Sequence, residues 1–219
     1  MKKAVITGDI IQSTRMNDES RQLLYKAITQ VLKQVSKDFD MKSEMYRGDS
    51  FQCLIDYPEN ALRIALLIKT KIRSLNPAES LSEKINQPTW IFDARMAIGI
   101  GDAGKKTTQK LAATSGEAFI LSGHLLDALK NSKQALGIDT QDDYQDELET
   151  EILLLDTIIA RTTALQCEVI HLKLQDYSEI EIAKKLGIGQ SAVNQRSNLG
   201  NWNAIRTMID RFESIYANE

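Results

Sequence analysis

The sequence predicts an α+β protein in which a single sheet carries helices on one face and is followed by an all-α helix-turn-helix domain. Over the first half of the chain, short apolar runs typical of strands alternate with segments of helical spacing, which favours one mixed sheet. From Thr140 on, an acidic stretch gives way to strongly apolar helical patterns. We expect a sheet domain at residues 1–139, a linker helix at 140–160 and a helix-turn-helix domain at 161–219.

Each element of the first domain has its own pattern. An apolar run predicts a strand over residues 3–10, and leucine, alanine and valine residues at helical spacing predict a helix near 17–38. The stretch MYRGDSFQCLIDY favours a hairpin that turns at Gly48 and Asp49. The remaining expected elements are a helix near 58–75, a strand over 90–101 and a helix over 116–130.

Composition limits the environment and the partners of the chain. Its 219 residues are 42% hydrophobic and 26% charged, which is ordinary for a soluble globular protein. No stretch approaches the roughly 18 apolar residues of a membrane helix, so no membrane partner is expected. Cys53 and Cys167 lie far apart inside apolar patterns, which indicates reduced packing residues and a cytoplasmic location.

The charge is distributed unevenly. Residues 1–139 hold 20 Lys and Arg against 16 Asp and Glu, a net charge of +4, whereas residues 140–219 hold 7 against 14, a net charge of −7. The C-terminal part is therefore not a basic tail of the kind that coats nucleic acid.

Two aspartates are placed where a strand meets a turn. Asp9 ends the first apolar run in TGDIIQST, and Asp49 follows Gly48 in RGDSFQ. If the two strands are neighbours, the carboxylates converge at one edge of the sheet, where like charges are usually held by a cation. Oxygen ligands together with waters and a phosphate are typical of a Mg²⁺ site. The turn after Asp9 offers backbone N–H groups from Ile11 to Ser13 to a phosphate.

These stretches resemble class III nucleotidyl cyclases. GDIIQST is similar to the first metal motif of that family, RGDSFQCLIDYPENALRIAL to its G-D-x-F hairpin and following helix, and ARMAIGIGDA and GEAFILSGHLL to its next strand and helix. The match covers about residues 3–130 and implies a ferredoxin-like, cyclase-like sheet and a homodimer. It implies a metal site at Asp9, Asp49 and the Ile10 backbone. The outline also resembles the SatD-like bacterial proteins.

The resemblance to class III nucleotidyl cyclases implies that Mg²⁺ is the cofactor and that a nucleoside triphosphate is the ligand. The expected phosphate contacts are Ile11, Gln12, Ser13 and Arg47, and Lys105 and Lys106 are further candidates. Departures from the family pattern concern the catalytic groups. The base-selecting lysine and aspartate of the family fall on Met45 and Ala113, and its transition-state asparagine and arginine fall on Ile120 and His124. Positioned cationic donors supply much of the acceleration of phosphoryl transfer, so the loss of these groups argues against efficient cyclisation.

Three interpretations of the aspartate pair remain open at this point. Asp9 and Asp49 cap their turns by accepting backbone N–H groups, or they bind a metal and nucleotide as a sensor, or they serve an active cyclase. If Arg47 or Lys105 points into the cleft between the two aspartates, the enzyme is favoured; if apolar side chains fill the cleft, it is not.

The C-terminal part resembles the helix-turn-helix of sigma factors and LuxR-type regulators. YSEIEIAKKLGIGQSAVNQRSN matches their S-x-x-E-I-A-x-x-L pattern. Ser178 and Glu181 have the spacing of a capping box, and Gly187 to Gly189 form the turn. We expect Ile180 and Ile182 of the first helix to face inward. In such a motif the second helix enters the major groove.

The second helix of this motif supplies the candidate DNA contacts. Asn and Gln side chains can bind adenine, Arg can bind guanine and Ser can bind phosphate. The expected contact residues are Gln190, Ser191, Asn194, Gln195, Arg196 and Asn198. From residue 160 onward 7 Lys and Arg balance 7 Asp and Glu, so a single domain should bind DNA weakly and a dimer would offset that.

Taken together, the sequence favours a cytoplasmic DNA-binding transcriptional regulator. Its degenerate cyclase-like domain would sense a nucleotide or metal and dimerise. The alternative is a divergent nucleotidyl cyclase, or another Mg²⁺-dependent phosphoryl-transfer enzyme, with an accessory helix-turn-helix.

Overall fold

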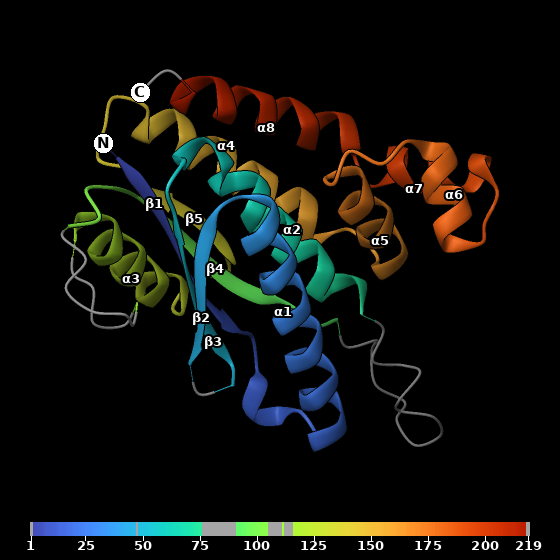
Figure 1. Ribbon diagram of the computed structural model, residues 1–219, viewed down its shortest axis with the longest axis horizontal. Helices are drawn as coiled ribbons and strands as arrows, with labels where there is room; N and C mark the ends of the chain where they lie inside the picture. Colours follow the sequence, from blue (N-terminus) through green and yellow to red (C-terminus); the bar gives the residue numbers. More distant parts are fainter. Residues whose placement is uncertain (1, 47, 76–90, 105–110, 112–115, 218–219) are drawn as a thin grey trace.

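The computed structural model describes residues 2–46, 48–75, 91–104, 111 and 116–217 (Figure 1). The strands in these ranges are β1 (Lys3–Ile10), β2 (Met41–Tyr46), β3 (Ser50–Ile55), β4 (Ala94–Gly101) and β5 (Leu136–Asp139). The helices are α1 (Asp18–Asp38), α2 (Ala61–Ser74), α3 (Glu117–Leu129), α4 (Gln145–Ala160), α5 (Ala164–Lys173), α6 (Glu179–Leu186), α7 (Gln190–Leu199) and α8 (Trp202–Tyr216), with 3-10 turns η1 (Ser13–Arg15) and η2 (Pro58–Asn60).

The five strands form one sheet within the described residues, in the order β2-β3-β1-β4-β5. The first four are antiparallel to their neighbours, and β5 runs parallel to β4. The chain order β1-α1-β2-β3-α2-β4 with this strand order is the ferredoxin-like arrangement, as the sequence predicts. Because β1 and β3 are direct neighbours, the ends of the strands that carry Asp9 and Asp49 meet at one edge.

Helices cover both faces of the sheet, so the expectation of helices on one face is wrong. Successive residues of a strand point to opposite faces. Ala4 and Ile6 pack into the core that includes α1 and α2, whereas Val5 packs with Leu54 and the α3 residue Ala118. Figure 1 shows α3 on the other side of the sheet from α1 and α2. The run AVI is apolar at every position because β1 is buried on both sides.

The strand β5 is absent from the sequence-based expectation, since it has only four residues. It adds to the edge of the sheet beside β4, and α4 packs on it. The residues of α4 that point inward are Leu148, Ile152, Leu155 and Ile159. The segment at 140–160 thus contains a helix packed against the sheet, and the division of the chain at this segment stays a prediction.

Two of the C-terminal helices, α5 and α6, begin with side-chain caps. Thr163 and Ser178 each form a capping box, and Gly187 ends α6 in the left-handed region with φ 64°. Ile182 is fully buried, but Ile180 is 69% exposed, so its predicted inward orientation is wrong. The reason is that Ile180 lies in the first turn of the short helix α6, two residues before Ile182, and therefore points to a different side.

A buried ion cluster joins the sheet layer to the C-terminal helices. Lys69 and Arg73 of α2 both bind the Asp93 carboxylate, at 2.9 and 2.5 Å. Arg73 also donates to the carbonyl oxygens of Ala160 and Thr162, at 3.1 and 3.2 Å, at the connection between α4 and α5. Both cationic side chains are almost fully buried. The cluster therefore fixes α2 against the segment between α4 and α5.

The cysteines behave as expected, because Cys53 and Cys167 are both free and buried. Among the residues that the structure describes, no helix combines the length and the apolarity needed to cross a bilayer.

Candidate nucleotide and metal site

Asp9 sits beside a cation that sequence reasoning missed. It lies on β1 directly opposite Ser50 of β3 on one side and Arg95 of β4 on the other. Arg95 Nη1 donates to Asp9 Oδ1 over 3.1 Å, and to Oδ2 over 3.4 Å. The side chains of Asp9 and Arg95 are 18% and 21% exposed, so the pair is accessible from solvent.

The Asp9 carboxylate is partly buried, and burial dominates its electrostatics. Burial raises the pKa of Asp9 and outweighs the attraction of Arg95 and Lys130, which lowers it. The nearby Asp49 carboxylate raises the Asp9 pKa further. An ionised Asp9 is therefore undercompensated, and an added cation would stabilise it.

Asp49 is held by the turn that follows β1. Its backbone oxygen accepts from the Ile10 N–H at 2.9 Å, and its Oδ2 accepts from Ser13 Oγ at 3.0 Å. Gly48 precedes it with φ +79°, a conformation that glycine adopts without strain, so the hairpin can turn there. The carboxylate thus faces the β1–α1 turn, on the same edge of the sheet as Asp9.

Neither carboxylate accepts a backbone N–H within the described ranges. Asp9 bonds to a guanidinium, and Asp49 bonds to the hydroxyls of Ser13 and, at 3.4 Å, Ser50. Backbone capping was the basis of the structural interpretation of the pair, and the described contacts give it no support.

The turn after β1 is built tightly. Gln12 has φ 59°, in the left-handed region that few non-glycine residues adopt, and it opens η1. The Ile11 N–H donates to the Asp93 carbonyl at 3.0 Å, so this N–H is not free for a phosphate. The N–H groups that open a helical turn have no partner inside it, which leaves Ser13 and Thr14 as the better donors.

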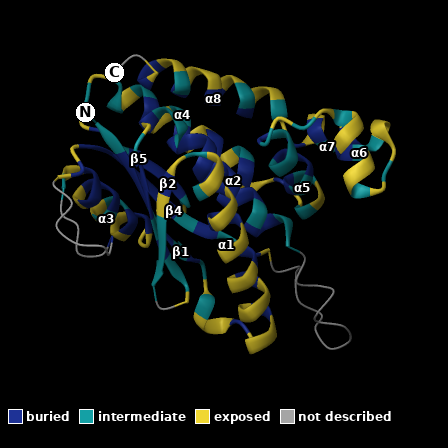
Figure 2. Ribbon diagram, viewed as in Figure 1, coloured by how far each residue is buried: buried dark blue, intermediate teal, exposed yellow. Residues whose placement is uncertain are grey.

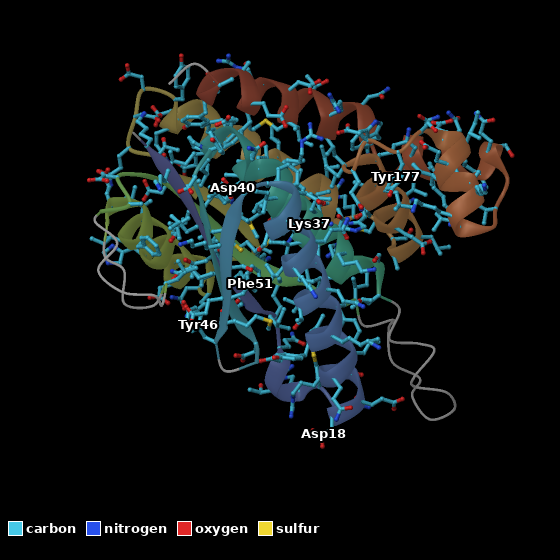
Figure 3. The ribbon with its side chains drawn as sticks, in the orientation of Figure 1. Asp18, Lys37, Asp40, Tyr46, Phe51 and Tyr177 are labelled. Carbon is cyan, nitrogen blue, oxygen red and sulfur yellow. The ribbon has the colours of Figure 1, made fainter. Side chains whose placement is uncertain are left out.

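Gly8 allows the neighbouring side chain to pack at the base of the site. Phe51 lies opposite Gly8 on β3, and a Cβ at position 8 would meet the Phe51 ring at 2.4 Å. Phe51 and Tyr46 leave the sheet on opposite faces (Figure 3). The glycine of TGD thus lets a phenylalanine lie over the strand end that presents Asp9.

A pocket of about 500 Å³ opens beside Asp49. It lies between the β1–α1 turn, the start of α1 and the β2–β3 hairpin. Its lining residues are Ser13, Thr14, Arg21, Gln22, Tyr25, Gly48 and Asp49. Tyr25 is 47% exposed, and Arg21 donates to the Met16 carbonyl at 3.0 Å. The pocket combines an aromatic surface, an anchored guanidinium and a carboxylate, which are groups that can contact a base, a phosphate and a metal.

Several predicted contacts lie outside the described residues. These are Arg47, Lys105 and Lys106; Ala113, a position where the family has an aspartate, also lies outside the described residues. Of the other family positions, Met45 is half-buried on β2, and Ile120 and His124 are exposed on α3. No group of three or more His, Cys, Asp and Glu side chains able to hold a metal occurs in the described part of the chain. A cation at this edge would therefore be bound by the two aspartates with other oxygen atoms.

The candidate DNA contacts lie on α7. Gln190, Ser191, Asn194, Gln195 and Asn198 are exposed, and Asn198 donates to Asn194. Arg196 is only half-exposed and lies 3.7 Å from Glu168 of α5. The exposed surface of α7 is thus uncharged and rich in amides.

Comparison with solved structures gives neighbours of low sequence identity. A bacterial light-regulated adenylyl cyclase is 13% identical with a TM-score of 0.42 and covers 63% of this chain and 74% of its own. The GGDEF domain of DgcB from Caulobacter crescentus, in complex with c-di-GMP, is 10% identical with a TM-score of 0.45 over 64% and 77%. The guanylyl cyclase Cya2 is 16% identical with a TM-score of 0.40 over 58% and 70%.

At these identities and TM-scores the likeness supports no conclusion about this chain. The class of fold is assigned from the strand order of the sheet itself. No protein-family model matches the chain, and no curated protein matches it. The resemblances to SatD-like proteins and to helix-turn-helix regulators therefore stay predictions.

Proposed function

We propose that the sheet domain binds a nucleoside triphosphate with Mg²⁺ at the Asp9–Asp49 edge and acts on it, as a divergent nucleotidyl cyclase or another Mg²⁺-dependent phosphoryl-transfer enzyme. The observation that carries this proposal is Arg95. A cationic side chain beside a carboxylate metal site can bind phosphate oxygens, and Arg95 lies 3.1 Å from Asp9. Positive charge aimed at phosphate oxygens is the main catalytic device in phosphoryl transfer.

The donors at the edge fit Mg²⁺. The carboxylates of Asp9 and Asp49 and the backbone oxygen of Ile10 would hold it, and Mg²⁺ prefers such oxygen ligands with the remaining positions taken by waters and phosphates. A bound Mg²⁺ would neutralise charge on the phosphates. Burial raises the pKa of Asp9 despite the adjacent Arg95, so a bound cation would stabilise the ionised form of this carboxylate.

The triphosphate would lie along the β1–α1 turn. Ser13 and Thr14 would contact it through their backbone N–H groups, and Ser13 also through its hydroxyl. Arg95 would bind a phosphate oxygen once a cation binds Asp9. The pocket beside Asp49 would hold the rest of the nucleotide. Ile120 and His124 stand where the family has its transition-state asparagine and arginine, and both are exposed on α3. Arg95 would supply the charge that these positions lack.

The test is product analysis. Purified protein is incubated with each common nucleoside triphosphate and Mg²⁺, and the nucleotides are separated by chromatography and identified by mass spectrometry. We expect triphosphate to be converted to a cyclic or shortened product with release of pyrophosphate or phosphate. The variants Asp9→Asn and Asp49→Asn should lose this conversion, whereas Asp127→Asn, an exposed carboxylate on α3, should keep it.

Binding without conversion would contradict the enzyme and leave a nucleotide sensor. Conversion that survives in both aspartate variants would mean that the activity comes from elsewhere, and the site assignment would be wrong.

A second function, DNA binding by α6 and α7, is favoured by a separate observation. The two helices are joined by the turn of Gly187 to Gly189, and α7 exposes one row of side chains at helical spacing, Gln190, Asn194 and Asn198. Amides in such a row can bind adenine in the major groove. Because Arg196 lies against Glu168, it would contribute to DNA binding only after leaving that contact.

This function is tested by selection of DNA sequences from a random pool, followed by titration. An enriched site whose affinity drops about tenfold in Asn194→Ala would support it. The control is Gln30→Ala, an exposed amide on α1. If no sequence is enriched, or if Asn194→Ala binds as the wild type does, α7 does not contact DNA.

A further inference from the structure

The outer face of α4 is apolar in the middle and oppositely charged at its two ends. Its outward residues follow the alternating spacing of four and three that marks a helix-packing stripe, which consists of Glu147, Glu151, Leu154, Ile158 and Arg161. We call this set the α4 stripe. Leu154 in its centre is 61% exposed, although the opposite face of α4 is fully buried on the sheet (Figure 2).

A groove runs beside the α4 stripe. It has a volume of about 500 Å³ and lies between α4 and α8. Leu154 and Ile158 form one wall, and Ala204 and Met208 form the other, with Glu151 and Arg211 at the rim. Its size and apolar walls suit the side chain of another helix.

At the ends of the stripe, Glu147 has an ion-pair partner, whereas Glu151 and Arg161 have none among the described residues. Arg211 binds both oxygens of Glu147, at 2.7 and 3.1 Å. Glu151 Oε2 is buried, and no hydrogen-bond donor reaches it in the described part of the chain. Burial and the Glu147 carboxylate raise the pKa of Glu151. Arg161, at the other end, is exposed, and the ion pairs found among the described residues do not include it.

We propose that the α4 stripe is a homodimer interface in which two copies of α4 pack antiparallel about a two-fold axis at Leu154. Antiparallel packing brings the acidic end of each stripe to the basic end of the other. Glu147 and Arg161 are each seven residues from Leu154, about 10 Å along the axis, so the two-fold places each opposite the other.

Each Arg161 then lies about 6 Å along the axis from the partner subunit's Glu151, within reach of its side chain. Each Leu154 enters the groove of the other copy, as knobs enter holes.

The charge pattern selects a second copy over other partners. A basic peptide would meet Arg161, and an acidic peptide would meet Glu151, since Glu147 is already paired with Arg211; either leaves one end of the stripe facing like charge. A second copy satisfies both ends at once. This contact is distinct from the Asp9–Asp49 edge and does not depend on the proposed activity.

The test uses the full chain. The two residues at position 154 face each other across the proposed two-fold axis. A disulfide needs Cα atoms about 4.4–6.8 Å apart, so it should form only if the two copies of α4 are packed closely at this position. Under mild oxidation, Leu154→Cys should give a covalent dimer. The matched control is Leu153→Cys, which is 48% exposed but points about 100° away around the helix, and it should stay monomeric on a denaturing gel. Cys53 and Cys167 are buried and should not interfere.

A second measurement tests the charges. Sedimentation should show the dimer of the wild type weakened about 30-fold in Leu154→Lys. Glu151→Arg and Arg161→Glu should each weaken it, and the double variant Glu151→Arg/Arg161→Glu should dimerise more tightly than Arg161→Glu alone, because the contact between positions 151 and 161 is recreated with reversed sign while Glu147 still faces a like charge. A monomeric wild type, a dimer indifferent to Leu154→Lys, or equal cross-linking at positions 153 and 154 would each overturn the proposal.

Discussion

Arg95 and Asp9 face each other across neighbouring antiparallel strands, and the Arg95 guanidinium binds the Asp9 carboxylate at 3.1 Å. The pair lies at the edge where Asp49 meets Ser13. An arginine in this position competes with a metal for Asp9 when no nucleotide is present, and it can bind phosphate once a metal has taken its place. Replacing Arg95 should therefore change the affinity for Mg²⁺ alone and the affinity for the Mg²⁺–nucleotide complex in opposite directions.

Replacing Arg95 should separate metal binding from nucleotide binding. In Arg95→Ala, Mg²⁺ alone should bind at least as tightly as in the wild type, because the competing cation is gone. The Mg²⁺–nucleotide complex should bind about tenfold more weakly, because a charge-assisted contact to phosphate is lost. Isothermal titration calorimetry measures both affinities. Parallel losses for the two ligands would indicate that Arg95 only maintains the fold.

Asp93 should be a strong determinant of stability. It is the shared partner of Lys69 and Arg73, whose side chains are 0% and 4% exposed. Removing one member of a buried ionic cluster leaves uncompensated charge, so Asp93→Asn should lower the free energy of unfolding by about 3 kcal/mol. Urea denaturation measures this. Asp127→Asn, which breaks an exposed pair with Lys130, is the control and should change it by less than about 0.5 kcal/mol. Equal effects would mean that the buried cluster is not coupled to stability.

His171 should make the contact between α2 and α5 sensitive to acid. Its Nδ1 donates to the Leu67 carbonyl at 3.1 Å, and burial lowers its pKa from 6.5 to about 4. Because the folded state disfavours the imidazolium, this contribution to stability is present above pH 6.5 and is lost as the pH falls toward 4.

Between pH 7 and pH 5 the wild type should therefore lose about 2 kcal/mol of unfolding free energy through this group. The measurement is urea denaturation at several pH values, with His171→Asn beside the wild type. The difference in stability between the two proteins should shrink as the pH falls. A difference that stays constant with pH would show that His171 does not titrate between the two states.

Gly8 should be intolerant of a side chain because of Phe51. A methyl group at position 8 would overlap the Phe51 ring, so Gly8→Ala should destabilise the protein by about 1–3 kcal/mol. Thermal unfolding of Gly8→Ala, Phe51→Leu and the double variant measures the coupling. The double variant should be more stable than the sum of the single effects, since leucine leaves room for the methyl group. Strict additivity would place the cause elsewhere.

The sequence was sufficient to predict that Asp9 and Asp49 lie at one edge of the sheet, but not that Arg95 binds Asp9 there. Asp9 and Asp49 could be placed together because each lies where a strand meets a turn, and the strand order then decides whether they meet. Arg95 could not be assigned, because its meeting with Asp9 depends on the register between β1 and β4, which no local pattern determines. Its only signal is a charged residue inside an otherwise apolar strand, ARMAIGIG.

The position of α3 was missed for a related reason. A strand covered on one face alternates between apolar and polar residues, whereas AVI in β1 and AIGI in β4 do not. That continuity was a usable sign that helices lie on both faces. The four-residue strand β5 carried no comparable signal, since so short a run cannot be distinguished from a loop by periodicity.

The most direct test of the central claim is the stability of the protein in Mg²⁺ and nucleoside triphosphate, measured for the wild type and for Asp9→Asn/Asp49→Asn. A ligand at 100 times its dissociation constant should stabilise the wild type by about 2.7 kcal/mol and the double variant by far less. If no triphosphate stabilises the wild type, or if the double variant is stabilised equally, the Asp9–Asp49 edge is not a metal–nucleotide site.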